Sequence, residues 1–118
     1  MELNELTKSE EEIMKVLWEL EKGFVKEVMT RLPEPKPAYT SISTVIRILE
    51  RKGFVSYEVF GNTHRYFPLI RIEEYKRFAV EKLLKGYFGN SVTNMLHFIA
   101  MENDMDLREL CFLQQRTT

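Results

Sequence analysis

Apolar residues recur at helical spacing within the first twenty positions of the chain, where i, i+3, i+4 and i+7 are all hydrophobic from Ile13 onward. This period of 3.6 residues predicts an amphipathic helix. Two patterns near its start match a capping box, in which a hydroxyl and a glutamate three residues later satisfy free backbone amides. They are Ser9 with Glu12, and Thr7 with Glu10. We expect the helix to begin near Ser9.

Two more helices are predicted before the middle of the chain. A short one fits Val25 to Leu32. It stops at Pro33, Pro35 and Pro37, because proline lacks an amide donor and disfavours helix in the residue before it. The next fits the segment that starts at Tyr39 and ends at Lys52, and Gly53 supplies the left-handed residue that commonly follows a helix end. Its inward-facing residues are Ile42, Val45, Ile46 and Leu49, which fall on one face.

After Gly53 the period of the pattern changes to two. Large residues alternate from Val55 to Val59, residues 61–63 form a turn, and the chain returns to Pro68. This is the pattern of a β-hairpin. Three helices followed by a hairpin predict a winged helix-turn-helix, so the fold class is mainly α with a small β-hairpin wing.

Beyond Ile70 the pattern is helical again, over residues 72–84 and 91–100 and more weakly over Leu107–Gln115. The first two segments carry more large apolar side chains than two short helices can hide against one winged domain, which indicates a partner surface. A two-fold homodimer is the commonest way to cover such a surface. The alternative is that the helices fold back on the winged domain of a monomer.

We therefore divide the chain into a winged-helix domain over residues 1–70 and a helical dimerisation domain over residues 71–118. The candidate dimerisation residues are Tyr75, Phe78, Leu83, Val92, Met95, Leu96 and Ile99.

Composition narrows the class of protein. A chain of 118 residues with 44% hydrophobic and 30% charged residues is typical of a soluble globular protein, and the N-terminus lacks the basic and apolar segments of a secretion signal. We expect a cytoplasmic protein with no membrane segment. A lone Cys111 and two histidines leave no disulfide and no zinc-ligand set. Neither a glycine-rich phosphate loop nor a Ser/His/Asp set is present, so we expect no enzyme activity and no cofactor.

Charge is unevenly distributed along the chain. The formal net charge of −1 does not itself favour nucleic acid as a partner. Residues 26–70, however, hold seven Lys or Arg against four Glu, whereas residues 1–25 hold three Lys against seven Glu. The middle of the chain is therefore basic, although the same count is compatible with charges scattered over a solvated surface.

The polar face of the helix over residues 40–52 is unusual, because it carries hydroxyls and arginines instead of glutamates and lysines. An α-helix fits the major groove of B-DNA, where Ser and Thr contact base edges or phosphates and Arg forks onto guanine or phosphate. An ordinary solvated face, or a winged helix used only for protein–protein interaction, remains the alternative. The candidate DNA-binding residues of this helix are Thr40, Ser41, Ser43, Thr44, Arg47 and Arg51.

The tip of the predicted hairpin adds a second set of candidates. Asn62, Thr63, His64 and Arg65 sit at or beside the turn as potential phosphate donors. His64 could instead be a plain surface histidine. The aromatic residues of the hairpin, Tyr57, Tyr66 and Phe67, alternate in a way that favours packing in the hairpin core over stacking on bases.

Several segments resemble a known family. The segments are "LTKSEEEIMKVLWEL" from residue 6, "TSISTVIRILERKGFV" from residue 40 and "GNTHRYFPLI" from residue 61. They are similar to the penicillinase-repressor family of bacterial transcriptional regulators, the BlaI and MecI type. The resemblance implies an N-terminal winged helix, a small helical dimerisation domain, and repression of resistance genes by a homodimer bound to an inverted-repeat operator. The implied base-reading positions lie near Ser41, Ser43 and Thr44, although better-known members often have a basic residue where Ser43 stands.

The resemblance also bears on how repression ends. In the family, induction involves proteolytic cutting in the dimerisation helix between an Asn and a Phe, which implies a sensor protease as a partner. The matching pair here is His97-Phe98, which keeps the Phe but not the Asn. Copper-responsive relatives use a cysteine-rich C-terminal metal site, and the single Cys111 argues against that branch.

Overall fold

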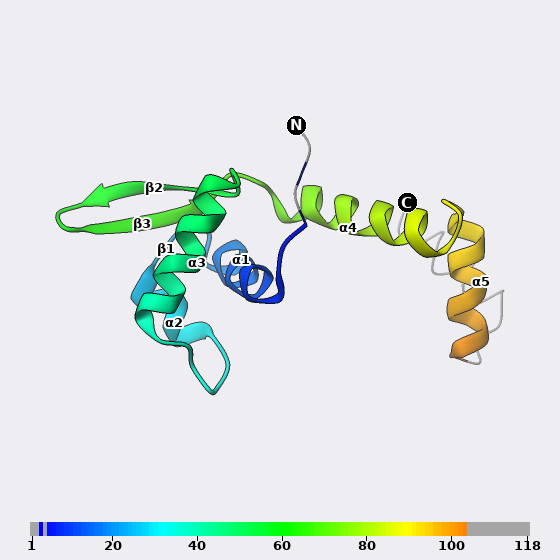
Figure 1. Ribbon diagram of the computed structural model, residues 1–118, viewed down its shortest axis with the longest axis horizontal. Helices are drawn as coiled ribbons and strands as arrows, with labels where there is room; N and C mark the ends of the chain where they lie inside the picture. Colours follow the sequence, from blue (N-terminus) through cyan, green and yellow to red (C-terminus); the bar gives the residue numbers. More distant parts are fainter. Residues whose placement is uncertain (1–2, 4, 104–118) are drawn as a thin grey trace. The chain divides into compact units, whose positions relative to one another are not determined.

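The computed structural model describes Leu3 and residues 5–103. The predicted helix over Leu107–Gln115 and Cys111 lie outside the described residues. The chain forms two compact units, Met1–Lys76 and Arg77–Thr118. The elements in chain order are α1 (Lys8–Leu20), β1 (Gly23–Phe24), α2 (Val25–Arg31), α3 (Tyr39–Arg51), β2 (Val55–Phe60), β3 (Thr63–Pro68), α4 (Ile72–Tyr87) and α5 (Val92–Glu102) (Figure 1).

At the start of helix α1, the second of the two predicted capping boxes is the one that forms. The amide of Glu10 donates to the Thr7 hydroxyl at 3.3 Å, and the amide of Thr7 donates to the Glu10 carboxylate at 2.8 Å. Thr7 is thus the N-cap, and the helix begins at Lys8, one residue before Ser9, which confirms the expected start near Ser9. The Glu10 side chain is buried, so the choice between the two boxes depends on packing that the local pattern does not contain.

The buried Glu10 carboxylate makes stability depend on acidity. Burial alone would raise the pKa of Glu10, but hydrogen bonds from the Lys52 ammonium, at 2.8 Å, and from Thr7 hold this pKa below its ordinary value of 4.5. A lowered folded-state pKa stabilises the fold above the unfolded-state pKa, and that stabilisation is lost as the pH falls through the folded-state value. We expect the free energy of unfolding, measured in urea, to fall more steeply below about pH 4.5 for wild type than for Glu10→Gln. Parallel pH profiles of the two proteins would contradict the assignment.

Helix α3 has the inward face that its spacing predicts. Ile42, Ile46 and Leu49 are buried, and Val45 is half-buried. The helix ends in a Schellman motif: the Phe54 amide donates to the Leu49 carbonyl at 2.9 Å, and the Gly53 amide donates to the Glu50 carbonyl at 3.0 Å. Gly53 has a φ of 83°, the left-handed conformation expected of it.

The hairpin forms, with a tighter turn than expected and with an additional partner. Gly61 and Asn62 alone connect β2 to β3, and Thr63 already pairs with Phe60. The two-residue strand β1, which the sequence analysis missed, pairs antiparallel with β3, so the sheet order is β1-β3-β2. Two residues carry no periodic signal, and only their tertiary pairing identifies them as a strand.

The core of the first unit lies between its helices and this sheet. Its fully buried side chains come from α1, α2, α3 and the start of β2: Met14, Leu17, Val28, Ile42, Ile46, Leu49, Phe54 and Val55. Trp18 packs against this core, and its indole N–H donates to the Ile70 carbonyl at 2.8 Å. Because Ile42, Ile46 and Leu49 of α3 are buried in this core, the opposite face of α3 points away from it.

Tyr75, at the start of α4, belongs to the first unit. Its ring lies 5.8 Å from the Trp18 ring and 6.0 Å from the Phe54 ring, centroid to centroid, and its hydroxyl accepts from the Leu6 amide at 3.3 Å. The chain therefore divides after Lys76, six residues beyond the expected boundary. Tyr75 packs in the winged unit and not on the dimer face that the sequence analysis predicted for it.

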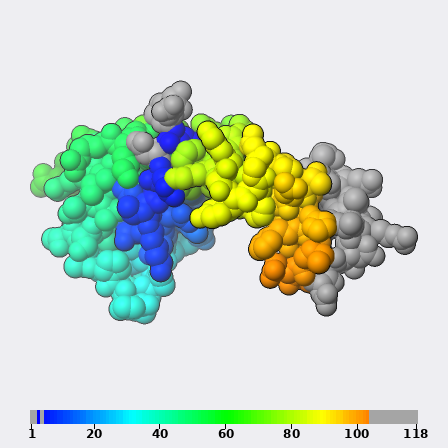
Figure 2. Space-filling model, turned by 45° about the vertical axis from the view of Figure 1, so that its right-hand side comes forward, coloured from blue at the N-terminus to red at the C-terminus, as the bar shows by residue number. Residues whose placement is uncertain are grey.

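The second unit contains the rest of α4 and helix α5. The Ser91 hydroxyl caps α5 by accepting from the Asn94 amide at 3.1 Å. Leu84 and Ala100 are buried, whereas Tyr87 and Met101 are 81% and 70% exposed. Figure 2 shows part of the surface of the second unit in yellow and orange. Within the described part of the chain, none of the helices is both long and apolar enough to cross a membrane.

Candidate nucleic-acid interface

The outward face of α3 presents five of the six side chains that the sequence analysis selected. The exposed residues are Thr40, Ser41, Thr44, Arg47 and Arg51, whereas Ser43 is half-buried. The Thr44 hydroxyl donates to the Thr40 carbonyl at 2.9 Å, so this side chain offers a methyl group and an acceptor to a partner. Within residues 5–103, neither arginine has a carboxylate at ion-pair distance. Both guanidinium groups are available to an external acceptor.

A concavity of about 510 Å³ lies between α3, the first turn of α2 and the tip of the hairpin. It brings Ser43 and Arg47 of α3 together with residues 62–64 of the hairpin. Its cationic side chains are Arg47 and Lys26, and its one carboxylate, Glu27, already accepts from the Phe24 amide at 3.0 Å. The walls therefore suit an anionic partner.

His64 is held at the edge of this concavity by an aromatic stack. Its ring lies parallel to that of Tyr57, with centroids 4.1 Å apart and an interplanar angle of 7°. The Tyr66 ring meets His64 edge-on at 6.1 Å. The expectation that Tyr57 packs in the hairpin core is wrong: Tyr57 is exposed and supports His64, whereas Tyr66 is buried.

Arg65 does not join the concavity, because successive side chains of a strand point to opposite faces of a sheet. It forms an ion pair of 3.7 Å with Glu58, its cross-strand neighbour. Its guanidinium carbon lies 4.9 Å from the Phe60 ring centroid. Arg65 thus lies with Glu58 and Phe60 on the face opposite His64, away from the concavity, and its phosphate contact stays a prediction.

Tyr66 also lines the concavity. Burial raises the pKa of the Tyr66 phenol, and the nearby Glu50 carboxylate adds to the effect. The phenol therefore keeps its proton at neutral pH and can donate a hydrogen bond.

The sequence analysis did not predict the roles of two lysines, one that lines the concavity and one that fixes the turn before α3. Lys26 lines the concavity from the first turn of α2, and its position in the first helix of the predicted helix-turn-helix could have indicated this. The Lys36 ammonium donates to the carbonyls of Met29, Thr30 and Leu32 at 3.1, 3.0 and 2.9 Å. Lys36 thereby satisfies free carbonyls at the end of α2 and fixes the turn that leads into α3.

Comparison with known proteins identifies the family. The family model described as "Penicillinase repressor" matches residues 6–118. The chain belongs to the penicillinase repressor family. This membership confirms the resemblance carried by the three quoted segments, and the penicillinase repressors are transcriptional repressors, not an enzyme class.

One solved structure supports the winged-helix fold. The solution structure of the DNA binding domain of the repressor BlaI is 25% identical to this chain, with a TM-score of 0.55, and the match covers 63% of this chain and 92% of that one. A structure described as the CopR repressor is 26% identical, with a TM-score of 0.48 and coverage of 58% and 100%. No curated protein sequence matches the chain.

Proposed function

We propose that this protein is a homodimeric transcriptional repressor that binds an inverted-repeat operator in double-stranded DNA through α3 and the hairpin tip. The observation that carries the proposal is the concavity, which places Arg47 opposite residues 62–64. Among the described residues, Arg47 has no ion-pair partner, and the one carboxylate that lines the concavity, Glu27, already accepts a hydrogen bond. The family membership and the likeness to the BlaI DNA-binding domain support DNA as the partner.

In the proposed complex, α3 lies in the major groove. Ser41 and Ser43 have short side chains, which allow close approach to base edges, and the Thr44 methyl group suits contact with a thymine methyl. Arg47 and Arg51 reach guanine or phosphate as forked donors.

The hairpin tip contacts the neighbouring backbone. The concavity between α3 and the tip is then the place for the sugar-phosphate strand that borders the major groove. Lys26, Thr63 and His64 supply positioning contacts there, and such contacts fix register without reading sequence.

The second unit supplies the proposed dimer contact. Leu83 and Val92 are 43% and 48% exposed, and Phe78, Met95, Leu96 and Ile99 are half-buried. Exposed apolar surface of this kind marks a partner site. A two-fold dimer would present two copies of α3 to half-sites about one DNA turn, roughly 34 Å, apart.

Release of DNA by a sensor protease is the proposed route of induction. His97 and Phe98 are exposed on α5, within a helix that runs from Val92 to Glu102. A protease that cuts this bond requires local opening of α5, and the Phe88–Phe98 ring contact at 5.7 Å opposes that opening.

Selection from a pool of random DNA duplexes tests the proposal with the full chain. We expect enrichment of a sequence with two inverted half-sites, bound by a species of twice the 14.1 kDa chain mass. Affinity should fall as salt rises, because phosphate contacts release counterions. Failure to enrich any sequence at physiological salt would reject the operator, and it would favour a winged helix that serves protein–protein interaction.

A further inference from the structure

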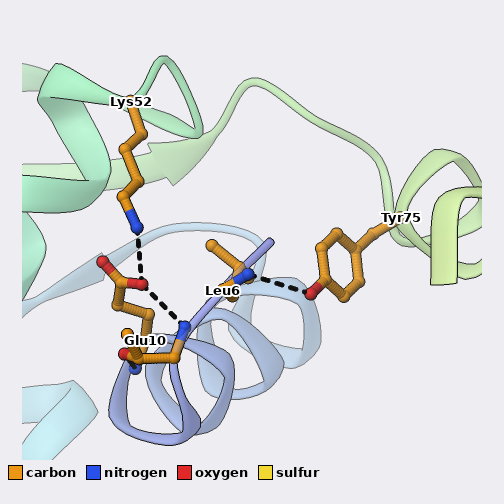
Figure 3. A network of polar contacts seen from close by, with 5 residues as sticks. Leu6, Glu10, Lys52 and Tyr75 are labelled. Atoms are coloured by element: carbon orange, nitrogen blue, oxygen red, sulfur yellow. Dashed lines mark hydrogen bonds and ion pairs between the residues drawn. The ribbon is translucent and has the colours of Figure 1, made fainter. Parts of the chain in front are cut away.

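A partly buried ion pair lies outside the proposed DNA surface and has no part in the proposed DNA contacts (Figure 3). The Lys52 ammonium donates to the Glu10 carboxylate at 2.8 Å, and the side chains of Lys52 and Glu10 are 26% and 4% exposed. A carboxylate this buried is uncommon in a small domain unless it is paired. The pair joins residues 42 positions apart in the sequence.

The Glu10–Lys52 pair connects the beginning of α1 to the end of α3. Lys52 is the C-cap of α3, and its backbone amide donates to the Ile48 carbonyl at 2.9 Å. Glu10 is the third residue of α1 and closes its capping box. Each charge therefore suits the dipole of its own helix, because anions favour helix N-termini and cations favour C-termini.

The α1 end of the pair is itself held in place. The amide of Thr7 donates to the Glu10 carboxylate at 2.8 Å, and the preceding amide, that of Leu6, donates to the Tyr75 hydroxyl at 3.3 Å. Figure 3 shows the Lys52–Glu10 contact beside the Leu6–Tyr75 contact, with the Tyr75 side chain reaching from α4. Lys52 is thus anchored to a fixed point of the first unit.

Stability alone does not account for this pair. Apolar residues of similar volume often replace a buried ion pair with no loss of stability. Apolar packing of Ile42, Ile46 and Leu49 holds α3 against the core, but it is non-directional. A short charged hydrogen bond has a defined geometry and therefore fixes the position of the helix end.

We propose that Glu10 and Lys52 are positioning residues that set the orientation of α3, so that the pair controls discrimination between operator and random DNA without touching DNA. The proposal rests on the proposed function. Productive contacts require side chains held within about 0.5 Å of the correct geometry, whereas backbone contacts to random DNA tolerate more displacement.

The competing account is that Lys52 leaves Glu10 and binds a DNA phosphate. The two accounts differ in three observables. Loss of a phosphate contact weakens binding to all sequences and lowers the salt slope by about 1. Loss of a positioning contact weakens binding to the selected duplex and leaves the slope unchanged. Removing the Glu10 charge would free Lys52 for phosphate and strengthen binding in the competing account, but it weakens selective binding in ours.

The test compares full-length variants on the duplex selected by wild type and on a random duplex of equal length. For Lys52→Met and Glu10→Gln we expect about a tenfold lower affinity for the selected duplex, less than a twofold change on the random duplex and an unchanged salt slope. Lys52→Arg, which keeps the charge and the donor, should recover most of the selectivity. The matched control is Lys15→Met, which removes an exposed lysine of α1 paired with Glu11 at 3.1 Å and should change neither affinity.

Each result has a defined meaning. If wild type selects no sequence, the proposed function fails before this inference is reached. If wild type is selective and Lys52→Met weakens both duplexes equally with a smaller salt slope, Lys52 is a phosphate contact and the inference is overturned. Folded variants with wild-type selectivity would also overturn it. Should Lys52→Met fail to fold, Glu10→Gln decides, because glutamine keeps the shape and the acceptor of the capping box.

Discussion

Replacing Phe54 by alanine is expected to lower the free energy of unfolding of the winged unit by about 3–5 kcal/mol. Phe54 is 1% exposed, and its ring packs 6.0 Å from that of Tyr75. Its amide closes the Schellman motif of α3, and its carbonyl accepts from the Leu69 amide at 2.7 Å. The side chain thus fills the core where α3, β2 and the start of α4 meet. Urea denaturation of the full chain, followed by tryptophan fluorescence of Trp18, measures the loss.

Phe60→Ala is the matched control for Phe54→Ala. Phe60 has the same side chain but is 45% exposed at the end of β2. Its removal should cost about 1 kcal/mol or less, because it loses a ring contact with Phe24 and creates little cavity. Equal losses for the two variants would show that the buried junction at Phe54 is not the main support of the first unit.

Arg47→Ala is expected to weaken binding to the selected duplex by about tenfold to a hundredfold, the range for a guanidinium that contacts a base edge. Arg47 is exposed on α3, lines the concavity and, within the described residues, has no ion-pair partner to compete with DNA. The loss should be largest on the selected sequence and small on random DNA. Fluorescence anisotropy of a labelled duplex at fixed salt measures both affinities.

Arg71→Ala removes the same charge from a different place. The Arg71 side chain is 78% exposed between β3 and α4, and it does not line the concavity. Its loss should change the affinity by less than about twofold. If both arginine variants weakened binding equally, the effect would come from net charge, and α3 would have no special role.

Much of the fold could be predicted because each element carries its own signal. The aliphatic stripe of α3 and the glycine at 53 lie within one segment, and both the inward face and the left-handed cap are confirmed. The change of period at Val55 predicts the hairpin for the same reason. Local sequence is sufficient where hydrogen bonding and burial both repeat within a few residues.

The remaining features depend on contacts between distant residues. The capping box forms at Thr7 instead of Ser9, and its Glu10 meets Lys52 from the far end of α3. Strand β1 exists through its pairing with β3. Tyr75 lies in a helix whose pattern suits a dimer face, yet its ring packs on Trp18. A local sequence pattern identifies none of these partners, because they are distant in the sequence.

The candidate site divides in the same way. The exposed face of α3 follows from helical spacing, and its residues lie where the sequence predicts. The sequence analysis grouped the four residues of the hairpin tip, but strand alternation places Arg65 on the face opposite His64. Lys26 joins the concavity through the packing of α2 beside α3.

The most direct measurement of whether α3 and the hairpin tip contact DNA is an NMR titration of the ¹⁵N-labelled full chain with the selected duplex. We predict that the largest amide shifts fall on residues 40–51 of α3, on residues 62–64 of the tip and on Lys26. Shifts confined to α1, or to the opposite face of the sheet around Glu58 and Arg65, with the amides of α3 unchanged, would contradict the proposed interface.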